Sequence, residues 1–178
     1  MEKSEWLYAN EEDNSCRYVL GQKGDNPLIV FGINPSIAEP TYIGLSDPTI
    51  DKIKRLSLKL DCDGWIMLNI YPQRSTNPNG MHQSLNNQIH ERNLIEIQNV
   101  LSKYPGSLVV AAWGNLIYKR GYLANCLNDI NQIMIDNKKE WYCFALNKSG
   151  QPKHPLYVKE DKLDLAFFYF YSGKELRS

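Results

Sequence analysis

Four short apolar runs constrain the fold of this chain more than any other feature of its sequence. They cover residues 28–33, 65–70, 108–113 and 141–146, and each has the continuous apolar character of a strand buried on both faces. Patterns typical of amphipathic helices separate one run from the next. The sequence therefore predicts the order β-α-β-α-β-α-β and a mainly parallel sheet packed between helices.

The three helical patterns are defined by apolar residues that recur every three or four positions. These residues are Ile50, Ile53, Leu56 and Leu60, then Leu94, Ile97 and Leu101, and finally Leu123, Leu127, Ile130 and Met134. Asp47 followed by Pro48 is typical of a helix N-cap and first helical position. We expect Gly64 to end the region of the first helix and Asn115 to cap the third.

The flanking segments add two further elements. Residues 16–20 predict an antiparallel edge strand, which a turn at 21–27 joins to the first apolar run. Residues 161–172 fit either a terminal helix or a strand, and the helix is favoured. We therefore expect one domain over 1–178, with its core at about 17–160. Its fold would be a three-layer α/β/α sandwich with a mainly parallel four-stranded sheet and an N-terminal edge strand.

Charge and composition exclude several classes of protein. The 20 basic residues balance the 20 acidic ones, so no global field attracts the chain to nucleic acid or to anionic lipid. No run approaches the roughly 18 apolar residues of a membrane span, and the charged N-terminus does not resemble a signal peptide. The four cysteines show no C-x-x-C spacing. We expect a cytoplasmic protein with no membrane partner, and composition leaves its oligomeric state open.

Polar side chains follow the predicted strands. Asn34 lies just after the first apolar run, Asn69 lies near the end of the second, and His154 lies in a loop after the fourth. Because parallel strands have their carboxyl ends at one edge of the sheet, we expect these three side chains to meet there, where ligands of such folds bind. The segments around them supply further candidates for substrate binding, namely Gly32, Pro35, Ser36, Tyr42, Arg74 and Trp113.

Each of the main candidates also has a structural explanation that stays open. Asn34 could belong to a plain turn, Asn69 could cap a neighbouring loop, and Arg74 could be a solvated loop residue. Trp113 fits core packing, and His154 could be an ordinary exposed histidine.

Recognised cofactor and metal motifs are missing from the sequence. It contains no Walker loop, no G-x-G-x-x-G, no H-E-x-x-H and no Cys/His cluster, and no ligand set accompanies His82 or His90. We therefore expect neither a cofactor nor a metal.

The ordered motifs resemble the uracil-DNA glycosylase superfamily across about residues 17–160. They are Gly-Ile-Asn-Pro at 32–35, Leu-Asn at 68–69, Trp-Gly at 113–114 and His-Pro at 154–155, each after a predicted strand. The first is similar to the mismatch-specific branch, whereas Leu-Asn and His-Pro are similar to the uracil-specific branch. The resemblance departs after His-Pro, where the uracil-specific branch has Ser-Pro and this chain has Leu-Tyr.

Other motifs more closely resemble the uncharacterised family catalogued as domain of unknown function 1643. They are Asn-Pro-Ser at 34–36, Asp-Pro-Thr at 47–49, Arg-Ser-Thr at 74–76 and Ala-Trp-Gly at 112–114. This resemblance carries an expectation about the fold and none about an activity.

The glycosylase resemblance implies a role for each of three residues. Asn34 would position a water, Asn69 would read the edge of a base, and His154 would stabilise the oxygen of a departing pyrimidine anion. The expected function is therefore the handling of a nucleobase-containing small molecule or nucleic acid, with hydrolysis of an N-glycosidic bond as the leading chemistry. A non-catalytic recognition module of the same fold and an enzyme acting on a small metabolite are the alternatives, so the sequence does not decide whether the protein is an enzyme.

Overall fold

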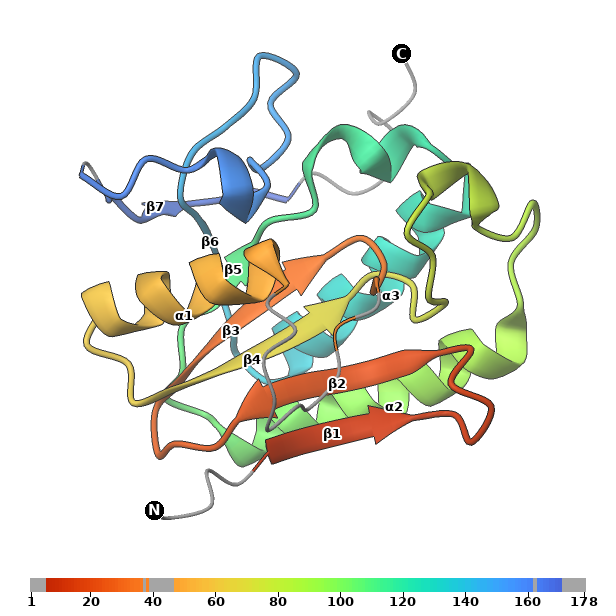
Figure 1. Ribbon diagram of the computed structural model, residues 1–178, viewed down its shortest axis with the longest axis horizontal. Coiled ribbons are helices and arrows are strands. Elements are labelled where there is room, and N and C mark those ends of the chain that lie inside the picture. Colours follow the sequence, from red (N-terminus) through yellow and green to blue (C-terminus); the bar gives the residue numbers. More distant parts are fainter. Residues whose placement is uncertain (1–5, 37, 39–46, 162, 171–178) are drawn as a thin grey trace.

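The computed structural model of the protein describes residues 6–36, 38, 47–161 and 163–170 and contains one mixed sheet. The strands lie in the order β1-β2-β4-β3-β5-β6-β7 (Figure 1). Their bounds are Trp6–Asn10 (β1), Arg17–Gln22 (β2), Pro27–Gly32 (β3), Gly64–Asn69 (β4), Val109–Ala111 (β5), Trp141–Cys143 (β6) and Ala166–Phe167 (β7). The α-helices are Pro48–Lys59 (α1), Asn87–Lys103 (α2) and Tyr122–Asp136 (α3), and the 3-10 helices are Pro78–Gly80 (η1), Gly114–Tyr118 (η2) and Pro155–Tyr157 (η3).

The α/β class predicted from the sequence is confirmed, but the sheet is larger than expected. β4, β3, β5 and β6 run parallel and coincide with the four apolar runs. Three antiparallel strands extend this centre, with β2 beside β4, β1 beside β2, and β7 beside β6. The strand predicted to lie at the edge, β2, is therefore an inner strand. It lies between β1 and β4.

The C-terminal segment forms a strand, and the preference for a helix was wrong. The Phe168 N–H donates to the Trp141 oxygen at 2.8 Å, next to the β6–β7 pairing. Phe168 and Phe170 pack against the core, whereas Phe167 and Tyr169 are exposed. This alternation has the period of two that belongs to a strand.

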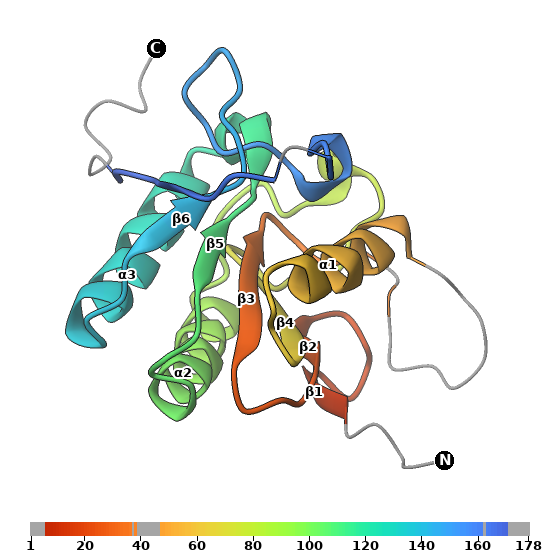
Figure 2. The same cartoon turned by 90° about the vertical axis from the view of Figure 1, so that its left-hand side faces the viewer.

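The helices cover both faces of the sheet. α1 lies on one face, and α2 and α3 lie on the other (Figures 1 and 2). Side chains alternate along the strands, so Val30 and Met67 pack toward α1 while Phe31 and Leu68 pack toward α2 and α3. None of the helices in the described part of the chain combines the length and apolar character needed to cross a membrane.

The start of α1 agrees with the sequence, whereas two other helix-boundary predictions were wrong. Asp47 Oδ1 accepts the N–H groups of Thr49 and Ile50 at 2.8 and 3.2 Å, as expected of an N-cap before Pro48. Gly64 does not end this helix region: α1 is already capped at Leu60, and Gly64 begins β4. A Cβ on Gly64 would lie 2.6 Å from a backbone oxygen of β2, which is why the close pairing needs glycine.

Asn115 is not the cap of α3. It lies inside η2, and α3 begins only at Tyr122 with no side-chain cap. The cause is Gly114, whose φ of +65° turns the chain into the 3-10 helix immediately after Trp113.

Candidate functional site

A pocket of about 210 Å³ lies at the carboxyl ends of β3 and β4, on the face of the sheet that α1 covers. Its wall comes mainly from the end of β3, the loop after β4, the first turn of α1, η2 and the loop that precedes η3. Five of the residues predicted from the sequence line it, namely Gly32, Asn34, Ser36, Trp113 and His154. Pro35, Asn69 and Arg74 are not among its lining residues, and Tyr42 lies outside the described residues.

Asn34 connects the loop after β3 with the loop after β4. Its Nδ2 donates to the oxygens of Pro35, Gln73 and Ser75 at 3.2, 3.4 and 3.0 Å. Pro35 is buried, and its oxygen also accepts the Ser75 N–H at 2.9 Å. The amide nitrogen of Asn34 is therefore engaged by backbone, and Oδ1 is the side-chain atom left for a ligand or a water.

Asn69 does not line the pocket but lies directly behind residues that do. It is fully buried, and neither Nδ2 nor Oδ1 makes a hydrogen bond among the described residues. A Cβ added to Gly32 would lie 3.2 Å from Asn69 Oδ1 and 2.5 Å from Met67 Cε, and Gly32 and Met67 both line the pocket. The carboxamide thus lies directly behind these two residues and caps no loop in the described structure.

An unpaired buried carboxamide is unusual. It costs about 1–3 kcal/mol relative to a satisfied one, and native proteins contain few such groups. Asn69 is the last residue of β4 and lies next to the pocket residues Gly32 and Met67.

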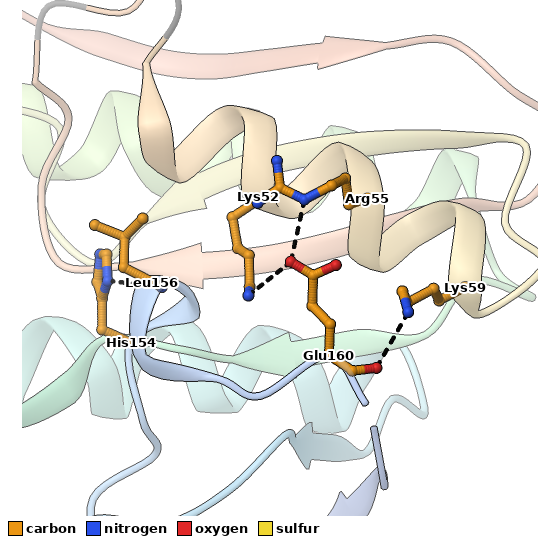
Figure 3. Close-up of polar contacts among 6 residues, drawn as sticks. All are labelled: Lys52, Arg55, Lys59, His154, Leu156 and Glu160. Atoms are coloured by element: carbon orange, nitrogen blue, oxygen red, sulfur yellow. Dashed lines mark hydrogen bonds and ion pairs between the residues drawn. The ribbon is translucent and has the colours of Figure 1, made fainter. Parts of the chain in front are cut away.

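His154 lies at the pocket as a half-buried side chain. The Leu156 N–H donates to His154 Nδ1 at 3.4 Å (Figure 3), so Nδ1 carries no hydrogen and the ring proton is on Nε2. Burial lowers the pKa of His154 below its ordinary value, and the charge of Asp47 opposes this effect only partly. The side chain is therefore a neutral imidazole with an Nε2–H donor near neutral pH.

Glu160 fixes the loop that carries His154 onto α1. Its Oε1 lies 2.8 Å from Lys52 Nζ and 3.1 Å from Arg55 Nε, and its backbone oxygen accepts from Lys59 Nζ at 3.1 Å (Figure 3). The hydrogen bonds from Lys52 and Arg55 hold the pKa of Glu160 below its usual range. Three cations of one helix thus hold the segment after His154 in place.

Gly114 fixes the same loop from the other side. Its N–H donates to the Pro152 oxygen at 2.9 Å, and a Cβ at Gly114 would lie 3.7 Å from His154 Cβ. Trp113, just before it, is buried and donates from Nε1 to Gln151 Oε1 at 2.9 Å. Trp113 therefore has the packing role that the sequence left open, in addition to contributing to the pocket wall.

Asp47 is a pocket residue that sequence reasoning treated only as a helix cap. Besides the cap, its Oδ2 accepts a hydrogen bond from Ser36 Oγ at 2.9 Å. The carboxylate thus joins the loop after β3 to α1, in the same pocket wall as His154. The Asp-Pro pair in the sequence correctly indicated the helix cap. It gave no sign of the hydrogen bond to Ser36 or of the place of Asp47 in the pocket.

The structure assigns different positions to two arginines. Arg74, a predicted binding residue, donates to the Ser36 oxygen at 2.9 Å and to the Tyr8 hydroxyl at 2.7 Å and does not line the pocket. Arg17 of β2 lines it instead, although only 3% of Arg17 is exposed, and its Nη1 donates to the Ala38 oxygen at 2.8 Å. The sequence signal that could have identified Arg17 as a pocket residue is its charge within a strand-like run.

Among the described residues, no cluster of three or more His, Cys, Asp or Glu side chains could hold a metal ion.

The fold and the pocket define an α/β protein with a polar pocket at the carboxyl edge of its sheet. The chain belongs to the family described as "Protein of unknown function (DUF1643)", whose family model matches residues 17–156. This match confirms the closer of the two resemblances seen in the sequence. No curated protein and no solved structure matches the chain.

Proposed function

We propose that this protein binds a nucleobase-containing ligand in the pocket at the ends of β3 and β4 and hydrolyses its N-glycosidic bond. The observation that carries the proposal is that a neutral histidine donor, His154, lines a small pocket and that an unpaired buried carboxamide, Asn69, lies directly behind two other residues of its wall. A donor suits the oxygen of a base, and a carboxamide suits an edge that offers both a donor and an acceptor. The sequence resemblance to uracil-DNA glycosylases supports the same chemistry.

His154 supplies charge stabilisation in this proposal. Water attacks the sugar carbon, the bond from that carbon to the base nitrogen breaks, and its electron pair goes to the base. Negative charge then collects on a base oxygen, to which the His154 Nε2–H donates, while the proton lost by water ends on the released base. One such donor contributes about 2.7–4 kcal/mol to transition-state stabilisation.

Asn34 and Asn69 have complementary roles. Asn34 Oδ1 orients the attacking water, because Nδ2 is already bound to backbone oxygens. Asn69 reads the base edge once the Met67 methyl group moves from its place above Gly32, and a flexible thioether side chain makes such a movement inexpensive. The missing side chain at Gly32 then allows the base to approach the carboxamide closely.

Single-turnover release of free base tests this function. Nucleosides and oligonucleotides of each base are incubated with excess protein, and the rates of wild type, His154→Ala and His154→Gln are compared. We expect His154→Ala to lower the rate about 10²- to 10³-fold with ligand binding largely intact, because charge develops only as the bond breaks. An unchanged rate in His154→Ala removes His154 from the mechanism, and no release by wild type refutes the hydrolase.

A non-catalytic recognition module is the second candidate, and the side chains near the expected water favour it. Asn34 donates to three backbone oxygens, and the Asp47 carboxylate accepts three hydrogen bonds, from Thr49, Ile50 and Ser36. These bonds hold both side chains in structural roles and leave few of their atoms free to position a water. Tight binding of a nucleotide by wild type without any release of base supports this candidate.

A further inference from the structure

A second pocket adjoins the first at His154. Its volume is about 450 Å³, and it shares Trp113, Leu116 and His154 with the first pocket. The remaining wall comes from η2, from the start of the loop after β6 and from η3. The two pockets therefore share one stretch of wall, in which His154 lies.

The second pocket offers an exposed aromatic ring. Tyr157 is 72% exposed, and its ring centroid lies 6.0 Å from that of His154 at an interplanar angle of 59°. Leu116 and Leu156 are also exposed and supply apolar surface beside it. None of the described lining residues carries a carboxylate. Such a wall favours a flat ring stacked on Tyr157 and does not repel a nearby phosphate.

Two amides add hydrogen-bonding groups to this apolar surface. Asn115 Oδ1 accepts from Asn147 Nδ2 at 3.3 Å and from Ser149 Oγ at 2.7 Å. These bonds leave Asn115 Nδ2 as a donor and Asn147 Oδ1 as an acceptor, neither with a partner in the described part of the chain. A donor and an acceptor close together match the polar edge of a nucleobase.

We propose that the second pocket binds the neighbouring base of the same ligand, so that the substrate class is a single-stranded nucleic acid of at least two nucleotides. One base occupies the first pocket, and the next stacks on Tyr157. This inference rests on the function proposed above and specifies its substrate. The stacking face of a base is free only where the strand is unpaired, and stacking tolerates all four bases.

Stacking also lowers the dependence of binding on cationic side chains. Duplex binding depends mainly on contacts between cationic side chains and phosphates, and the formal net charge of this chain is zero. Stacking on an aromatic side chain contributes without such contacts. The second pocket is thus suited to a strand that is held by its bases.

Equilibrium binding of mononucleotides and dinucleotides tests the inference. The 5′-monophosphate of each base is compared with the homodinucleotide of that base, in the deoxyribose and ribose forms. We expect wild type to bind the preferred dinucleotide about 10-fold or more tightly than its mononucleotide, and Tyr157→Ala to abolish this gain without changing mononucleotide affinity. Tyr169→Ala, a variant at a 74% exposed tyrosine outside both pockets, is the matched control and keeps the gain.

The outcomes separate the second pocket from the function of the first. If mononucleotide and dinucleotide bind equally well, the second pocket is not a base site and the proposed function stands. If Tyr157→Ala weakens both ligands alike, Tyr157 belongs to the first site and the inference is wrong. If wild type binds neither kind of ligand, the inference and the proposed function both fail. The deoxyribose and ribose arms identify the kind of strand.

Discussion

The two faces of the sheet differ most at its carboxyl edge. On the face toward α2 and α3, aromatic rings extend from the start of β6 to this end: Trp141 lies 5.0 Å from Phe31 and 5.2 Å from Trp113 by centroid distance, both in edge-to-face geometry. The two indole N–H groups donate to Asn131 and Gln151 at 2.9 Å. On the face toward α1, the same end holds the pocket and an unpaired carboxamide.

This difference separates the residues that stabilise the fold from those that remain available to a ligand. Satisfied polar atoms among packed rings indicate a region whose purpose is structural. An unsatisfied buried carboxamide beside a cavity indicates a region that is complete only when something else is bound. Variants on the two faces should therefore change different measurements.

The largest expected effect is a loss of stability on the face toward α2 and α3. Trp141→Ala removes a buried ring that contacts Phe31 and Trp113, and it should lower the free energy of unfolding by about 3–5 kcal/mol. Urea denaturation followed by circular dichroism measures this loss. The control Tyr157→Ala removes an exposed ring and should stay within about 0.5 kcal/mol of wild type. A loss below about 1 kcal/mol for Trp141→Ala contradicts the structural role of this face.

The sequence predicted the centre of this sheet but not its margins. The runs that became β3, β4, β5 and β6 are apolar because both of their faces are covered, and this signal is local. β1 has partly exposed residues throughout and β7 has exposed ones, so each depends on pairing with a neighbour that a local pattern does not reveal.

The candidate site was open to prediction only in part, for a similar reason. Parallel strands bring Asn34 and His154 to one edge, and the structure places both at one pocket, although their roles stay predictions. The contribution of Arg17 and the second hydrogen-bonded role of Asp47 arise between separate segments, which a local sequence pattern does not reveal. Arg74 looked available to a ligand because its partners, Tyr8 and Ser36, lie far from it in the sequence.

A pair of buried asparagines compares the two faces with the same side chain. Asn69→Ala, toward α1, removes no hydrogen bond among the described residues and should change the free energy of unfolding by less than about 1 kcal/mol. Its affinity for the nucleotide that wild type prefers should fall instead, because the removed group is the one proposed to read the base. Urea denaturation and equilibrium binding on the same samples provide both measurements.

Asn93→Ala is the matched control for Asn69→Ala. Asn93 lies on α2, is equally buried, and donates from Nδ2 to the Asn69 backbone oxygen at 2.9 Å. Its loss leaves a buried carbonyl without this donor and should cost about 1–3 kcal/mol of stability. If instead Asn69→Ala is the more destabilising of the two and leaves affinity unchanged, Asn69 is a structural residue and the contrast between the faces is wrong.

The smallest effect is the dependence of stability on pH that His154 should confer on the pocket face. Burial lowers the pKa of His154 in the folded protein below 6.5, so in acid the unfolded chain binds the proton more readily than the folded one. The stabilising contribution is therefore fully present above pH 6.5 and is lost as the pH falls through the folded pKa. Urea denaturation at pH 7.5 and 5.5 should show a larger loss on acidification for wild type than for His154→Gln, which cannot titrate. Equal losses in the two proteins would mean that His154 is solvated in the folded protein. The proposal that burial keeps His154 neutral as a donor to the base would then be wrong.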